Sequence, residues 1–486
     1  MLNIVHIIGI VLTVGLLLAV SVLSGRRVTD ARSFATGGRS GSWMVCGAIL
    51  GTLVGGQSTI GTAQLAFSFG LSAWWFTIGA ALGALLLGLV YAGPLRRSGC
   101  TTVMEIVRRQ YGPRAEAVGS VLFLVGIFIS ITSQLLSSSA MLTSLFRLPQ
   151  PVALAVGAVL IAALVLFGGI RSAGAGGIAK LALLYVCSIA AGVAVWRLGS
   201  GLHGLAGSVA DVYASPTLRD VNGIASASDI HRRYGSLIAR GPLKDIGGCL
   251  SLTLGVVCTQ TYAQAIWSAS TTARARRGAV YCAALIPLIG AACTLVGIYM
   301  RGHYITAAEY SALTAAGEGL PQGVGVIENS MQAFPAFILR HLPSWLGGIA
   351  LGTLLINIMG SGSGLVLGAS TIVMRDVVRR DSLPGLRLSI VALLSLGVLA
   401  AGFMHGAFIN DLGFLSLGLR AAALLLPLSA ALWLPGRFAG RAVTLSMVAG
   451  TAAMLAAWLL HLPADPMYYG LAASALLLAV SRAPRP

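Results

Sequence analysis

Apolar runs long enough to cross a lipid bilayer follow one another along almost the whole chain. The hydrocarbon core of a bilayer is about 30 Å thick, which about 20 residues of helix span. Inside it, every backbone N–H and C=O group must be paired within the protein, so such a run folds as a helix. The sequence therefore predicts an all-α, polytopic membrane protein of about 13 spans. The runs cover residues 4–23, 42–67, 71–93, 115–147, 151–168, 175–198, 243–267, 278–299, 344–374, 387–404, 412–434, 438–460 and 467–482.

Composition and the placement of charge agree with this class. Of the 486 residues, 57% are hydrophobic and 9% are charged, which excludes a soluble domain of this size. The net charge of +18 alone would suggest nucleic acid, but the basic side chains gather in short loops that alternate along the chain. We therefore expect the lipid bilayer of the cell (inner) membrane and no nucleic-acid partner. The N-terminus is expected outside and the C-terminus in the cytoplasm.

Signals of secretion, metal binding and catalysis are weak. The first run begins MLNIVH without a basic region, so we expect a retained helix rather than a cleaved leader. Few residues follow the last run, so we expect no attached soluble domain. The seven cysteines lack metal-ligand spacing, and no carboxylate pair or Ser/His/Asp set falls within a run. We expect no enzyme activity and no cofactor.

The second run is interrupted in its middle. Within Gly47–Gly70, the glycines Gly55 and Gly56 precede three hydrogen-bonding side chains, and each glycine weakens a helix by about 1 kcal/mol. One interpretation is a broken helix that carries a binding site. The other is packing, because Gly47, Gly51 and Gly55 form a ladder of small residues that would admit a neighbouring helix.

Five short motifs follow in the order in which one family carries them. They are Gly38-Arg39-Ser40; Thr102 and Glu105 with Tyr111-Gly112; Gly168-Gly169; Gln264 with Ala269 and Ala275-Arg276-Arg277-Gly278; and Ser370-Thr371-Ile372 with Asp376. Together with the span count and the outward N-terminus, they resemble the sodium:solute symporter family, the relatives of the proline, sialic acid and sodium/glucose cotransporters. One departure is Met104, where the family has proline.

The resemblance implies a leucine-transporter-like fold, with two inverted five-helix repeats and a site at mid-membrane between discontinuous helices. Residues 1–41 would be an extra N-terminal helix and a cytoplasmic loop, 42–198 the first repeat and 199–242 an extracytoplasmic loop. Residues 243–434 would be the second repeat and 435–486 two further helices. A second outer segment, 300–343, is long enough to carry short helices. Under this fold the break at Gly55-Gly56 is expected.

The resemblance also implies a principal sodium site made of oxygen atoms, which suit a hard cation. The family's motifs place backbone carbonyls at Gly51, Val54 and Asn357 and hydroxyls at Gly360 and Ser361. Gly360 has no hydroxyl, so one ligand is missing.

Two further positions bear on sodium. An acidic residue common in the family's sixth helix falls on Gly177, and Ser363 could replace the ligand missing at Gly360 if the register slips by a few residues. Sodium coupling is therefore the expectation of the family but is weakened by this sequence.

Polar side chains in three spans are candidates to meet a solute. They are Gln57, Ser58 and Thr59 in the second span, Ser133 and Gln134 in the fourth, and Thr259, Gln260, Tyr262 and Gln264 in the seventh. We favour Gln57 and Gln260. The alternative for the hydroxyls is a hydrogen bond to a carbonyl of their own helix, which is all we expect of residues 137–139.

Two cations within the apolar runs need an explanation. Arg420 lies deep in its span, where an unpaired charge costs at least ~3 kcal/mol. Its candidate partners are backbone carbonyls, Asp411 or an anionic solute. Lys180 is the only lysine that lies beyond the first turn of a run; it either replaces the cation next to Gly360 or extends its stem to cytoplasmic water.

The function that these observations favour is secondary active transport. We expect cation-coupled symport, with sodium as the coupling ion, of a small polar organic solute by alternating access, in a monomeric functional unit. The alternatives are proton-coupled or sodium-independent transport with Lys180 in place of the cation, and a transporter-like sensor. The sequence does not name the solute, because one scaffold serves many.

Overall fold

The computed structural model describes residues 2–25, 40–100, 102–168, 175–378, 380, 382–404 and 406–480. Of the motif residues, Gly38, Arg39 and Gly169 lie outside this part of the chain, and the side chain of Asp376 is not described. The described elements are nearly all helices, which confirms the expected all-α class. The strands among them, β1 (Tyr304–Thr306) and β2 (Gly325–Ile327), pair in parallel.

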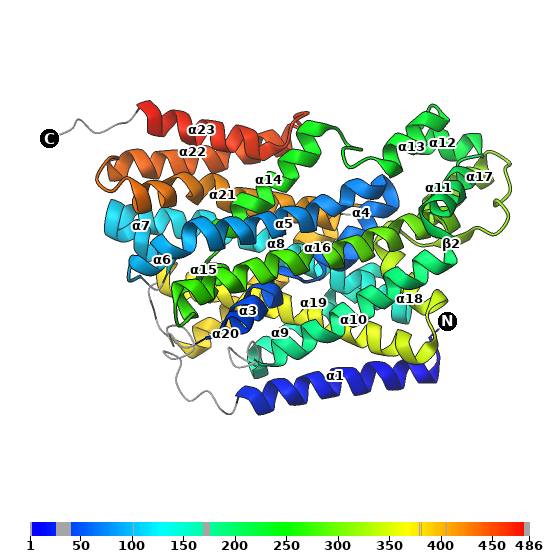
Figure 1. The fold of residues 1–486 in the computed structure, drawn as a ribbon, viewed down its shortest axis with the longest axis horizontal. Helices are drawn as coiled ribbons and strands as arrows, with labels where there is room; N and C mark the ends of the chain where they lie inside the picture. Colours follow the sequence, from blue (N-terminus) through cyan, green and yellow to red (C-terminus); the bar gives the residue numbers. More distant parts are fainter. Residues whose placement is uncertain are drawn as a thin grey trace.

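Every predicted apolar run contains one helix or a set of consecutive helices (Figure 1). These are α1 (Ile4–Gly25), α3 (Ser42–Leu53) with α4 (Thr62–Phe69), α5 (Trp75–Leu86) with α6 (Ala92–Arg97), α8 (Pro113–Phe146), α9 (Gln150–Ala163), α10 (Ala175–Leu198), α14 (Pro242–Cys258) with α15 (Gln260–Ser268), α16 (Thr272–His303), α19 (Ser344–Ile372), α20 (Leu383–Phe403), α21 (Ile409–Trp433), α22 (Gly440–Leu459) and α23 (Pro466–Val480).

The number of membrane crossings is less clear than the number of runs. Among the described residues, eight helices are long and apolar enough to cross a membrane, or nine when the bent pair α14–α15 counts as one span. Four shorter apolar helices lie in α1, α3, α9 and α23. The helical stretch from 57 to 97 is continuous by that measure, although Gly70, with φ at 57°, ends α4. The count of thirteen stays a prediction.

Short helices of the two long loops gather at one end of the molecule. Figure 1 shows α11 (Gly201–Val212), α12 (Pro216–Asn222), α13 (Ala227–Gly235), α17 (Ala307–Ala315) and α18 (Ala333–His341) at the end where the chain begins, whereas α23 finishes at the opposite end. Termini at opposite ends agree with an odd number of crossings.

The ion pairs of two arginines with buried side chains fix this end. The guanidinium of Arg301, at the end of α16, pairs with the carboxylate of Glu309 at 2.9 Å. Arg240 pairs with Asp245 at 2.8 Å and with Asp411 at 2.6 Å, and so ties the start of α14 to the start of α21. Asp411 was one candidate partner for Arg420, and this pairing assigns it to Arg240 instead.

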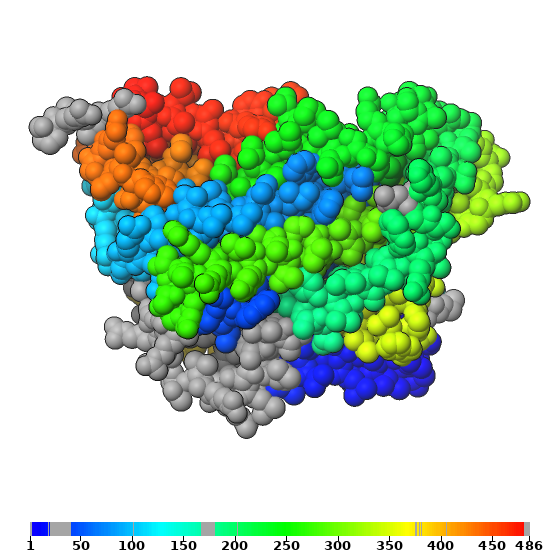
Figure 2. Space-filling model, in the orientation of Figure 1, coloured from blue at the N-terminus to red at the C-terminus, as the bar shows by residue number. Residues whose placement is uncertain are grey.

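Long helices pack against the interrupted runs: α16 against α3 and α4, and α5 and α21 against α14. In Figure 2, α5 and α16 run side by side across one face, and α8 packs against both α19 and α21. At the edge, α1 packs on α19 through small residues, because a Cβ on Gly9 would come within 2.9 Å of the Gly348 backbone. Helix α18 and the short turn η6 (Ser330–Gln332) cover the break in the second run from the loop end.

Candidate functional site

The helix of the second run is broken where its glycines predict. Helix α3 ends at Leu53, and Val54 has extended backbone angles of −94° and 99°. The chain resumes as a π-helical turn, η1 (Gln57–Gly61), before α4 begins. The expected break is therefore confirmed.

Side chains satisfy the backbone groups that the break frees. The N–H of Gly56 donates to Oε1 of Gln134 on α8 at 3.1 Å. The Ser58 hydroxyl donates to the Leu53 carbonyl and the Thr59 hydroxyl to the Gly55 carbonyl, both at 3.1 Å. Such pairing is what permits an irregular backbone inside a membrane. It also gives these two hydroxyls the structural role that we weighed against solute binding.

The glycines differ in what surrounds them. A Cβ on Gly56 would lie 2.4 Å from Cβ of Ser137, and one on Gly55 would lie 2.7 Å from Nε2 of Gln134. A Cβ on Gly51 would meet nothing within 4 Å. The close approach is thus made by α8 at the break itself. It does not extend to Gly51, the middle residue of the ladder that the packing interpretation requires.

The apolar run at residues 243–267 is broken as well. Helix α14 bends by 51° into α15 at Thr259, whose backbone angles of −85° and 123° are extended. Next to it, Oε1 of Gln260 accepts a hydrogen bond from the Val103 N–H at 2.8 Å, which caps the start of α7 (Val103–Tyr111). On α15, Tyr262 is buried and Gln264 is partly exposed. Their role toward a solute stays a prediction.

Gln57 is held between three elements. Its Nε2 donates to the Ser133 hydroxyl of α8 at 3.0 Å, and that hydroxyl donates to the carbonyl of Ile409, the first residue of α21, at 3.1 Å. The side chain of Gln57 is 8% exposed. The structure brings together three of the solute candidates named from the sequence, Gln57, Ser133 and Gln134. Their role toward a solute stays a prediction.

A second polar group at this place was missed. Gln64 donates to the Ala407 carbonyl at 3.2 Å and accepts from the Ile409 N–H at 3.0 Å, and Asn410 donates to the Thr62 hydroxyl at 3.3 Å. A signal was present in the sequence, because an amide side chain in an apolar run needs a partner. Its partners lie more than 340 residues away, so the pairing could not be read.

Arg420 is buried and holds three helices together. Its guanidinium donates to the hydroxyls of Ser130 and Ser416 at 2.9 Å each, to the Gly126 carbonyl at 3.5 Å and to the Thr259 hydroxyl at 3.3 Å. These partners lie on α8, on α21 itself and at the break between α14 and α15. All four acceptors are neutral oxygen atoms. One of them is a backbone carbonyl, which was among the candidate partners of Arg420.

Lys180 turns into the protein beside the break. Its Nζ donates to the Gly51 carbonyl at 3.3 Å, and its side chain is 9% exposed. A Cβ on Gly360 would lie 3.1 Å from Nζ. The stem therefore does not extend to water, and the ammonium reaches the position where the family's cation site was expected.

The other members of that expected site are also buried. The Ser361 hydroxyl donates to the Val54 carbonyl at 3.5 Å, and the fully buried amide of Asn357 has no hydrogen-bond partner among the described residues. Ser363 donates to the Gly360 carbonyl of its own helix at 2.9 Å, so it does not supply the missing hydroxyl.

Sodium fits this position poorly. A hard cation is bound by several oxygen atoms at once, yet Gly360 supplies none and the Gly51 carbonyl accepts from an ammonium. Two unit charges about 4 Å apart repel by about 4 kcal/mol at an effective dielectric constant of 20. The residues present therefore do not accommodate sodium while Lys180 occupies this place.

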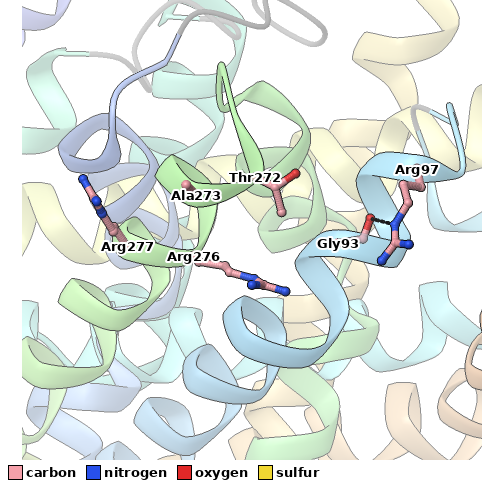
Figure 3. Close-up of a pocket in the computed structure, with 6 residues that line it drawn as sticks. All are labelled: Gly93, Arg97, Thr272, Ala273, Arg276 and Arg277. Atoms are coloured by element: carbon pink, nitrogen blue, oxygen red, sulfur yellow. Dashed lines mark hydrogen bonds between the residues drawn. The ribbon is translucent and has the colours of Figure 1, made fainter.

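A separate basic cavity lies at the end opposite the long loops. It has a volume of about 510 Å³ and is lined by Gly93, Arg97, Thr272, Ala273, Arg276 and Arg277. Figure 3 shows Arg97 and Arg276 pointing into the space between α6 and α16, whereas Arg277 points away from it. Its cationic lining belongs to the loops that we predict to be cytoplasmic.

Comparison with known proteins gives one family and several distant relatives. The model of the "Sodium:solute symporter family" matches residues 34–444. The "High-affinity choline transporter 1" of Torpedo marmorata is 25% identical over 353 residues, which cover 70% of this chain and 55% of the relative. The human "High affinity choline transporter 1" is 23% identical over 368 residues, covering 73% and 57%. The chain spans little more than half the length of these relatives.

Solved structures share the fold. The structure of a Na⁺-coupled sialic acid symporter has a TM-score of 0.69 at 17% identity and covers 98% of this chain and 97% of its own. The manganese transporter of Eremococcus coleocola, bound to an aromatic bis-isothiourea compound, has a TM-score of 0.52 at 15% identity, with coverage of 93% and 94%. At these identities the likeness concerns the fold alone.

Proposed function

The chain belongs to the sodium:solute symporter family, and on that premise we propose that it is a secondary active transporter that moves a small polar organic solute by alternating access. The observation that carries the proposal is the pair of broken helices. Val54–Gly56 interrupts one and Thr259 the other, and buried polar side chains surround both. Discontinuous helices of this kind form substrate sites in transporters with inverted repeats.

The proposed repeats are residues 42–198 and 243–434. In support, each begins with a helix that breaks partway along its length, and the long loop 199–242 separates them. We propose the N-terminal end, with its short helices, as the outer side. The arginines of the basic cavity, Arg97, Arg276 and Arg277, support a cytoplasmic location for the opposite end.

We propose Gln57 and Gln134 as the best-supported solute residues among those named from the sequence. Both are buried at the first break, and both offer amide groups that a polar solute can engage in place of their present partners. Ser58, Thr59, Gln260, Tyr262, Gln264 and Arg420 remain in the wider set. The functional unit is proposed to be a monomer.

Charge argues for a neutral or anionic solute. Lys180 and Arg420 are buried near the two breaks, and no acidic side chain pairs with either among the described residues. Two uncompensated cations repel a third cation in a low-dielectric interior. Choline, the cation named in the relatives, is therefore disfavoured in this chain, and solutes with a carboxylate are preferred.

Cation-coupled symport is the proposed mode. The family name makes sodium the first ion to test, and an ion that drives uptake would bind elsewhere than the place of the Lys180 ammonium. The experiment is counter-flow in proteoliposomes with a panel of neutral and anionic amino acids, sugars, carboxylates and choline, with sodium or potassium as the cation. Accumulation of a panel member supports transport, and no accumulation of any small solute argues for a sensor. Choline as the preferred solute would refute the charge argument.

A further inference from the structure

We propose that the ammonium of Lys180 is the built-in occupant of the principal cation position, so that this chain binds no sodium there. The inference rests on the proposed function, because a cation position has a role in a transport cycle only if the protein is a transporter. Its geometry rests on three helices: Lys180 comes from α10, its acceptor Gly51 from α3, and Gly360 from α19. The expected cation site lies between the last two.

Gly360 and Lys180 complement each other. The position that carries a hydroxyl in the family is a glycine here, and a Cβ built on it would lie 3.1 Å from Nζ. That distance is tighter than ordinary van der Waals contact, so a serine would place its hydroxyl in the space that the ammonium fills. The hydroxyl that is missing at Gly360 and the ammonium of Lys180 thus fall at the same place.

The other groups of the expected cation site bond the ammonium or one another, or have no partner. An ammonium has three donors, and the structure satisfies one of them at the Gly51 carbonyl. The Val54 carbonyl accepts from the Ser361 hydroxyl instead. The amide of Asn357, one turn before Ser361 on the same face of α19, is fully buried without a partner in the described part of the chain.

The alternative use of Lys180, a stem that reaches water, is inconsistent with its exposure. Long lysine stems cover apolar surface while the charged head stays in solvent, yet this side chain is 9% exposed and its head contacts a backbone carbonyl. None of the described acidic groups neutralises it.

A tethered cation differs from sodium in one respect that matters for transport. A bound ion can leave to the cytoplasm in each cycle, whereas Nζ can only withdraw as far as its stem allows. The attraction of the ammonium for the Gly51 carbonyl at the break would then persist through the cycle. The sodium concentration would not control it.

The first experiment compares the chain's two lysines. In Lys180→Met, uptake of the solute identified by counter-flow should fall at least about tenfold, the effect of losing a charge-assisted hydrogen bond, and added sodium should not restore it. Lys244→Met, which alters an exposed lysine at the start of α14, is the matched control and should transport normally. Sodium-dependent uptake that is unchanged in Lys180→Met would overturn the proposal.

The second experiment does not need transport. Purified protein is melted in detergent in sodium chloride or potassium chloride at equal ionic strength, because a ligand that binds the folded state raises the melting temperature. The wild type should show no sodium-specific rise in melting temperature that Ser361→Ala abolishes. The double variant Lys180→Ala/Gly360→Ser, which removes the ammonium and restores the hydroxyl, should gain such a shift.

The outcomes separate the two proposals. A sodium-specific shift in the wild type that Ser361→Ala abolishes would overturn the inference, whether or not any solute is transported. A double variant that folds but gains no shift would also count against it, since the site would then lack the ligands that we assign. A wild type that transports no solute, but behaves as expected in the melting experiment, would refute the proposed function and leave the inference standing.

Discussion

Substituting alanine for Gly56 or for Gly51 should have opposite effects on stability, although both glycines lie in the same run. On Gly56 the new methyl carbon would lie 2.4 Å from Cβ and from Oγ of Ser137. Non-bonded carbon atoms prefer a separation of about 3.5–4.0 Å, so α8 or the break would have to move by more than about 1 Å. On Gly51 the methyl group would meet nothing within 4 Å.

The magnitudes follow from these two surroundings. Extra atoms forced into a packed interior cost about 1–3 kcal/mol, so Gly56→Ala should destabilise the protein by that amount. Gly51 lies inside α3, where alanine is favoured over glycine by up to about 1 kcal/mol. The two variants should therefore differ by about 1–4 kcal/mol.

The seven cysteines provide the assay. All are free and buried in the structure, so a fluorogenic maleimide reports the temperature at which they become accessible. Gly56→Ala should melt below the wild type and Gly51→Ala at or above it. Adding Ser137→Gly to Gly56→Ala should recover part of the loss, with Ser137→Gly alone as the control. If Gly51→Ala melts lower than Gly56→Ala, the glycines serve a helix-packing ladder and our account of the break is wrong.

Three further outcomes are expected. Arg420→Lys keeps the charge but loses the planar fork that reaches several oxygens at once, so uptake should fall about tenfold or more while the protein still elutes as a single species. Burial acts to raise the pKa of Glu309, but the Arg301 guanidinium and neighbouring hydrogen bonds outweigh it and hold that pKa below its usual value. The pair's contribution to stability is therefore complete above the ordinary carboxyl pKa and lost as pH falls through the lowered one, and Glu309→Gln should lower the melting temperature at pH 7 but flatten its fall in acid. An amine-reactive reagent should modify Lys244 in the folded protein and spare Lys180, which mass spectrometry can measure; equal labelling would show that the ammonium reaches water.

What the sequence predicted was set by local chemistry. Adjacent glycines weaken a helix without always breaking it, since Gly247-Gly248 lies inside α14 and Gly347-Gly348 inside α19. The pair Gly55-Gly56, which polar side chains follow, lies at the observed break. A lone intramembrane lysine needs compensation, which directed attention to Lys180 before its acceptor was known.

Partners that are distant along the chain could not be predicted in this way. The side chain of Gln260 accepts from the Val103 N–H although the two residues are 157 positions apart. Nothing in the sequence near either residue indicates that Gln260 caps the start of α7. Ser139 likewise contacts the Gln150 carbonyl of α9 at 3.5 Å, not a carbonyl of its own helix as expected. Ser137 and Ser138 do bond within their helix. The period of a helix shows which residues share a face, but not which other helix that face meets.

One face of α8 connects the two broken helices. Gln134 accepts from the Gly56 N–H at the first break. Ser130, one turn earlier on the same helix, accepts from Arg420, which also donates to Thr259 at the second break. A shift of α8 along or about its axis would therefore alter the hydrogen bonds of both breaks at once. Alternating access requires the two repeats to move relative to each other around a fixed site, and these contacts mean that α8 cannot follow one repeat without changing its bonds to the other.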